Sequence, residues 1–115
     1  MIRGEIREVD FEPVRGSEAS KRRPAVVVSN DGANTTAARL NRGVITVVPV
    51  TSNVARVYPF QVYLRATECG LPLDSKAQAE QVRSVAVERV GRRMGELPAS
   101  IMSELEDALR LHLDL

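Results

Sequence analysis

The sequence predicts a mainly β fold of the α+β class: a small, strongly bent sheet or barrel followed by a C-terminal amphipathic helix. Short runs rich in valine and isoleucine recur along residues 5–87, and turn residues separate them at close intervals. Helical spacing of apolar residues begins after Pro98. With 115 residues, the chain is expected to form a single domain over residues 1–115.

Five strands are predicted from β-branched residues or from alternating polarity, and they cover residues 5–11, 25–29, 44–51, 60–65 and 81–87. The segments 12–22, 31–43 and 52–59 are rich in turn residues and are predicted to be loops. The first of these loops is long enough to suggest a functional role.

The final helix is predicted to open at Pro98, because proline is favoured at the start of a helix. Its apolar stripe consists of residues at three- and four-residue spacing: Ile101, Met102, Leu105, Ala108, Leu109 and His112. His112 is the only histidine, and on this stripe it is expected to be packed or interfacial and not catalytic.

Composition and charge exclude several classes of protein. No apolar run approaches the about 18 residues of a membrane span, and no signal sequence is evident, so a cytoplasmic protein is expected. The single cysteine, Cys69, cannot form an internal disulfide and receives no role. One cysteine, one histidine and scattered acids do not supply a metal site, and the dispersed glycines form no phosphate loop. No metal or cofactor is expected.

Arginine and hydroxyl groups remain as candidates for chemistry. Arg23 precedes Pro24, which restricts the backbone at the start of a valine-rich strand, and a guanidinium there could bind two oxygens of a phosphate. Thr51, Ser52 and Asn53 end another strand and could present hydroxyl and amide groups beside it. From the residues alone a simpler interpretation stays open, in which the cations are solvated loop charges and the polar triplet forms a turn.

Five ordered blocks then carry a resemblance: RGEIREVDFEP, GSEASKRRPAVVVSND, VITVVPVTSN, DSKAQAEQVRSV and MGELPASIMSELEDALRL. In order, spacing and residue type the chain resembles the MazF/PemK family of toxin endoribonucleases over nearly its whole length. The resemblance implies an SH3-like barrel of the CcdB and MazF type that works as a homodimer. It also implies metal-independent cleavage of single-stranded RNA to 2′,3′-cyclic phosphate and 5′-hydroxyl ends, and a cognate MazE-like antitoxin that occupies the RNA groove.

By position, the family's catalytic pair corresponds to Arg23 and Thr51. The RNA-binding residues that the resemblance implies are Gly16, Ser17, Glu18, Ser29, Asn30, Ser75, Glu80, Gln81 and Arg83. Ser52 and Asn53 are added because they adjoin Thr51, and Tyr58 because an exposed loop ring could stack on a base. Glu18 or Glu80 is the hypothesised general base, since a guanidinium is a poor one.

Two alternatives on the same fold are open. A CcdB-like toxin poisons gyrase by binding it, but such toxins rely on a C-terminal tryptophan, and this chain contains no tryptophan. A non-catalytic module that only binds an antitoxin would not need to retain Arg23 and Thr51. The sequence does not indicate the cleavage motif or the class of RNA that is cut.

Overall fold

The computed structural model describes residues 1–12 and 21–115. Its strands are β1 (Glu5–Glu12), β2 (Lys21–Val27), β3 (Val44–Thr51), β4 (Gln61–Leu64), β5 (Ser75–Gln78), β6 (Arg83–Ala86) and β7 (Val90–Glu96). Its helices are α1 (Asp31–Leu40), α2 (Ala66–Cys69) and α3 (Ala99–Leu113), with short 3₁₀ turns η1 (Ala79–Gln81) and η2 (Val87–Arg89).

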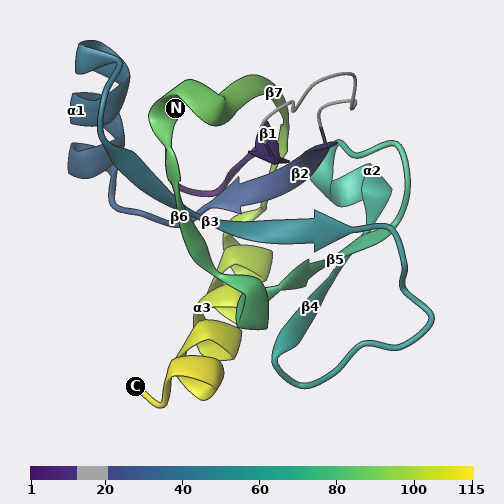
Figure 1. Cartoon of the computed structure of the whole chain (residues 1–115). Helices are drawn as coiled ribbons and strands as arrows, with labels where there is room; N and C mark the ends of the chain where they lie inside the picture. The colour runs from purple at the N-terminus through teal and green to yellow at the C-terminus, as the bar shows by residue number, and fades with distance from the viewer. Residues whose placement is uncertain (13–20) are drawn as a thin grey trace.

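The sheet is antiparallel, with the strand order β4-β5-β3-β2-β1-β7. One edge of β3 serves two partners, because its first half pairs with β6 and its last two residues pair with β5. The sheet therefore divides and bends along β3, and α3 crosses beneath it (Figure 1). This architecture confirms the predicted bent, mainly β fold with a C-terminal helix.

The valine run of β2 is buried on both faces of the sheet. Val26 belongs to a core that Leu105 and Ala108 of α3 complete, whereas Ala25 and Val27 belong to a second core that includes Ala37 of α1. A strand covered on both faces needs apolar residues at every position and not at alternate ones. This explains why the run shows no alternation.

The prediction of a loop over residues 31–43 was wrong, because α1 occupies most of it. Asn30 caps the helix by accepting a hydrogen bond from the backbone N–H of Ala33 at 2.8 Å. Within its ten residues the helix buries only Asn34 and Ala37. So small an apolar face leaves no helical periodicity in the sequence.

Other boundaries also differ from the prediction. Strand β2 begins at Lys21, four residues earlier than expected, because Arg22 lies opposite Asp10 of β1, where opposite charges favour pairing. Strands β5 and β7 and helix α2 were not predicted. β7 lies at the sheet edge and buries only Gly95, and β5 is a polar four-residue strand, so neither carries an apolar run.

The terminal helix matches its prediction closely. Pro98 caps α3, and Leu105 and Ala108 are buried beneath the sheet. His112 lies on the exposed final turn and contributes nothing to this core. In the part of the chain that the structure describes, no helix is long and apolar enough to cross a membrane.

Candidate functional site

Arg23 of β2 and Thr51 of β3 lie beyond the last paired position of these two strands, at the same end of the sheet. Ala25 pairs with Pro49, and the same register extended by two residues leads to Arg23 and Thr51 on one face. The start of β2 and the arrowhead of β3 lie at the same end of the sheet in Figure 1.

Two more residues extend this level across the sheet. Lys76 of β5 lies opposite Thr51, and Tyr63 of β4 lies opposite Lys76. We call Arg23, Thr51, Lys76 and Tyr63 the cross-sheet row. It spans three strand spacings, about 14 Å, and consists of an exposed cation, a hydroxyl, a buried cation and an aromatic ring in order.

The neighbouring arginines Arg22 and Arg23 near the start of β2 point to opposite faces of the sheet. Arg22 lies near Glu8 of β1, with Nη1 3.8 Å from the carboxylate, and Arg92 binds the same carboxylate at 3.0 Å. Arg23, one residue on, points to the opposite face and is exposed. Within residues 1–12 and 21–115 its guanidinium forms no ion pair, which leaves it available to an anion.

A hydrogen-bonded turn follows Thr51. The backbone N–H of Asn53 donates to Thr51 Oγ1 at 3.2 Å, and Asn53 Oδ1 accepts from the N–H of Ala55 at 3.4 Å. The Thr51 hydroxyl accepts through its oxygen, so its own proton can be donated to a ligand. Ser52 beside it is exposed.

The loop of residues 52–60 carries an aromatic pair. The rings of Tyr58 and Phe60 stack with centroids 5.3 Å apart and planes within 2°. Arg56 and Lys76 place their cationic groups 5.7 and 5.9 Å from the Tyr58 ring. Tyr58 is still 41% exposed, so this loop offers an aromatic surface beside the cross-sheet row.

A cavity of about 190 Å³ lies on the other face of the same sheet edge. Pro24, Val50 and three residues of the α2–β5 connection give it a largely apolar wall. Ser52 and Ser75 are its hydroxyl-bearing lining residues. Two residues predicted to contact RNA therefore share one cavity, although the Ser75 hydroxyl donates to the Leu73 carbonyl at 2.9 Å.

The remaining predicted residues of segment 75–83 have separate environments. Glu80 accepts a 2.6 Å hydrogen bond from Gln61 through Oε2, and its Oε1 is buried and lacks a partner among the described residues. Gln81 is exposed at the end of η1. Arg83 lies opposite Val47 of β3, with its guanidinium 5.2 Å from the centre of the Phe11 ring.

Ser29 and Asn30 are not brought together with the catalytic pair. They follow the end of β2 that is remote from Arg23, about 20 Å along an extended chain. Ser29 Oγ donates to Asn34 at 2.5 Å and accepts from the backbone of Thr46, while Asn30 caps α1. Gly16, Ser17 and Glu18 lie outside the described residues.

Tyr63 and Asp74 form a hydrogen-bonded pair at the end of the cross-sheet row. The N–H of Ala66 and the hydroxyl of Tyr63 each donate to one Asp74 oxygen at 2.8 Å. These two bonds hold the pKa of Asp74 below its ordinary value. The bond to the carboxylate raises the pKa of Tyr63, so the phenol remains a donor. The ring is 40% exposed and fixed in orientation.

A pH-dependent contribution to stability follows from this pair. Because folding lowers the pKa of Asp74, its carboxylate stabilises the fold above the ordinary pKa, and this contribution is lost as the pH falls through the lowered value. Urea denaturation should show wild type more stable than Asp74→Ala at pH 7, with the difference closing below about pH 4. A difference that is unchanged between pH 7 and pH 3 would contradict this assignment.

Sequence reasoning missed Lys76, Tyr63 and Arg56. Lys76 lies in a short polar strand with no strand signal, and only its pairing opposite Thr51 identifies it. Tyr63 lies within the predicted strand over residues 60–65, and its ring faces solvent. No local signal in the sequence marks any of the three.

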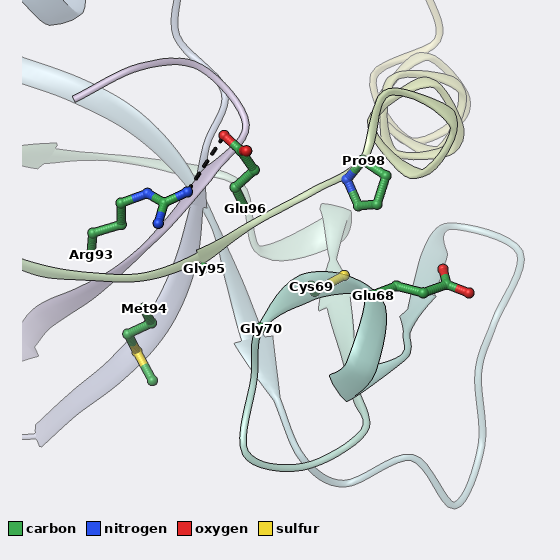
Figure 2. A pocket seen from close by; sticks show the side chains of 8 residues that line it. All are labelled: Glu68, Cys69, Gly70, Arg93, Met94, Gly95, Glu96 and Pro98. Carbon is green, nitrogen blue, oxygen red and sulfur yellow. Dashed lines mark ion pairs between the residues drawn. The ribbon is translucent and has the colours of Figure 1, made fainter.

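A second cavity, of about 330 Å³, lies between β7 and α2 (Figure 2). Arg93 and Glu96 form an ion pair at 3.6 Å on one wall, and Cys69 lies on the other, where burial raises the pKa of its thiol. Strands β1 and β2 separate β7 from β3, so this cavity is not part of the cross-sheet row. Across residues 1–12 and 21–115, no three His, Cys, Asp or Glu side chains are grouped as metal ligands.

Comparisons with known proteins assign a family to this chain. A family model described as "PemK-like, MazF-like toxin of type II toxin-antitoxin system" matches residues 2–113. The chain is 65% identical to endoribonuclease MazF9 of Mycobacterium tuberculosis (strain ATCC 25618 / H37Rv) over 115 residues, which cover 100% of this chain and 98% of the relative.

Two solved structures share the fold. MazE–MazF (Form-III) from Deinococcus radiodurans superposes with a TM-score of 0.77 at 27% identity, covering 100% of this chain and 97% of that one. An endoribonuclease in complex with its cognate antitoxin from Mycobacterial species also gives a TM-score of 0.77, at 23% identity, and covers 100% of this chain and 96% of that one. At that identity the second likeness shows the fold alone.

Proposed function

The chain belongs to the family of PemK-like, MazF-like toxins of type II toxin–antitoxin systems, and from this we propose that it is an endoribonuclease that cuts single-stranded RNA. Its relative with 65% identity over the full length is named an endoribonuclease. The site assignment is supported by the β2–β3 register, in which Ala25 pairs with Pro49 and an extension by two residues leads to Arg23 and Thr51. A guanidinium and a hydroxyl on neighbouring strands can bind one phosphate.

The proposed reaction uses the RNA's own nucleophile. The 2′-oxygen attacks the adjacent phosphorus, a new oxygen–phosphorus bond forms, and the bond to the 5′-oxygen breaks. The products are a 2′,3′-cyclic phosphate and a 5′-hydroxyl. Arg23 stabilises the charge that builds on the phosphate oxygens, and Thr51 donates a hydrogen bond to one of them. Alignment of the 2′-hydroxyl supplies the remaining acceleration.

The proton of the 2′-hydroxyl must pass to a base, while the 5′-oxygen gains one on leaving. Glu80 suits a positioning role better than proton transfer, because one of its oxygens accepts from Gln61 and the other is buried. We therefore assign the base role to Glu18, the other acid that the family resemblance implies near the RNA. Gly16 and Ser17 are assigned to the same RNA-flanking segment.

Base recognition is proposed at three places around this phosphate. The cavity lined by Ser52 and Ser75 could receive one unstacked base, with hydroxyl groups to read its edge. Tyr58 offers a ring for stacking, with Asn53 nearby in the same loop. Gln81 at the end of η1 and Arg83 at the start of β6 are exposed, and both are proposed to contact RNA.

The same surface is proposed to bind a cognate antitoxin in the cytoplasm. A MazE–MazF complex is among the structures that share this fold. Exposed cations on the site face suit an acidic, extended antitoxin segment that would compete directly with RNA. A homodimer is also proposed, because large apolar side chains remain exposed in one copy, among them Leu40, Val44, Leu111 and Leu113.

One substitution in the substrate tests the reaction. We expect a cleavable RNA oligonucleotide to resist cutting, by at least about 1,000-fold, when the nucleotide 5′ of the scissile bond is a deoxyribonucleotide. Cleavage of the all-ribose oligonucleotide should continue in EDTA. Single-turnover assays with end-labelled substrate measure both. Normal cutting of the deoxy-substituted substrate would eliminate attack by the 2′-hydroxyl, and complete inhibition by EDTA would contradict metal independence.

A further inference from the structure

Hydrogen bonds to side chains hold the loop of residues 52–60 next to the end of β3. Two of these bonds are local: the backbone N–H of Asn53 donates to Thr51 Oγ1, and that of Ala55 donates to Asn53 Oδ1. A third holds the far end of the loop, where the N–H of Tyr58 donates to Gln61 at 3.1 Å. The centre of the loop is held from another strand, because Lys76 Nζ of β5 donates to the Arg56 carbonyl at 2.6 Å.

Lys76 is unusually enclosed for a lysine. Only 8% of it is exposed, although its Cα partner Thr51 lies on the sheet edge that is proposed to bind RNA. A buried ammonium is costly unless polar groups surround it. The Arg56 carbonyl and the Tyr58 ring, whose centroid lies 5.9 Å from Nζ, fill that role. The buried lysine therefore connects the loop to the level of the catalytic pair.

The ring that Lys76 supports is held in one orientation. Phe60 stacks on Tyr58 in parallel, and Arg56 Nη1 donates to the Tyr58 hydroxyl at 3.3 Å. The exposed part of the ring is then a fixed surface in the free protein. A fixed ring loses little conformational freedom when a base stacks on it.

We infer that Lys76 is a positioning residue for substrate recognition. By binding the Arg56 carbonyl it holds Tyr58 as a stacking surface for an unpaired nucleobase next to the phosphate bound by Arg23 and Thr51. This inference rests on the proposed endoribonuclease function. Lys76 acts through the loop and not on the reacting atoms, since its ammonium is enclosed and donates to Arg56.

The test compares Lys76→Met with wild type on a pool of RNA oligonucleotides of randomised sequence. Methionine keeps the apolar stem and removes the ammonium. We expect KM to rise about 10-fold or more, kcat to stay within about 3-fold, and sequenced 5′ ends to show a less selective motif. Lys76→Arg, which can still donate to the carbonyl, should recover most of the loss. Arg42→Met is the charge-matched control and precedes β3 at the end remote from Thr51.

Two further measurements test whether the effect of Lys76→Met on KM acts through the loop of residues 52–60. Amide hydrogen exchange in residues 55–60 should accelerate in Lys76→Met, whether or not RNA is cut. In a double-mutant cycle, Lys76→Met should add little to the KM of Tyr58→Ala, because both changes remove the same surface. If the methionine variant does not fold, Lys76→Gln, whose side chain is one bond shorter, replaces it.

The outcomes distinguish this inference from the proposed function. Wild type that cuts no RNA would overturn the function and the positioning role together. Wild type that cuts RNA, with a Lys76→Met variant of unchanged KM, motif and exchange, would overturn only the positioning role. A fall in kcat alone, or effects fully additive with Tyr58→Ala, would also overturn it.

Discussion

Replacing Arg23 with alanine is expected to lower the single-turnover cleavage rate by about 100- to 1,000-fold, with the fold intact. Removing one donor to charge that develops in a transition state typically costs this much. Arg23 is exposed at the start of β2, so its side chain supports no packing that would be lost. Arg23→Lys keeps the positive charge but loses the planar guanidinium that can bind two phosphate oxygens, and we expect an intermediate cleavage rate.

The adjacent residue provides a matched control. Arg22 carries the same charge in the same strand, but it lies near Glu8 on the opposite face. Arg22→Ala should therefore cut RNA within about 3-fold of wild type, because an exposed ion pair of this kind contributes little. Equal cleavage by wild type and Arg23→Ala, or equal loss in both variants, would remove Arg23 from the catalytic role.

Replacing Gly95 with alanine is expected to destabilise the fold by about 3 kcal/mol. Gly95 of β7 lies against the end of α2, as Figure 2 shows, and a Cβ atom there would stand 2.0 Å from the Cys69 carbonyl oxygen. The Cys69 backbone cannot move away from the added Cβ as easily as a flexible side chain could. Either β7 must leave its pairing with β1 or α2 must shift.

Denaturant unfolding followed by circular dichroism measures this effect, and Gly32→Ala is its control. Gly32 lies in the first turn of α1, where the nearest atom to an added Cβ is a side-chain oxygen of Asn30 at 3.2 Å. Its free energy of unfolding should change by no more than about 1 kcal/mol. A Gly95→Ala variant as stable as Gly32→Ala would show that α2 is free to move away from β7.

Strands and helices that carry a clear apolar pattern in the sequence could be predicted. Strands that form because a neighbouring strand pairs with them could not. β3 was predicted with its observed boundaries because it is a run of β-branched residues, of which Ile45, Val47, Val48 and Val50 are buried. Helix α3 was predicted because its apolar stripe faces one core. Strands β5 and β7 carry exposed or polar residues and exist because a neighbour's backbone pairs with them. Helix α1 depends on the cap at Asn30 and a very small buried face.

The amino-acid order is enough to find the residue types of the site: a guanidinium before Pro24, a hydroxyl at the end of a buried strand, and a series of motifs that identifies the family. Which of these groups lie together depends on how the strands pair. The strand register selects Arg23 over Arg22 for the site face and adds Lys76 and Tyr63 to the row, whereas it leaves Ser29 and Asn30 at the other end. Side-chain direction alternates along a strand, so a shift of one residue in the pairing would turn every side chain of that strand to the other face.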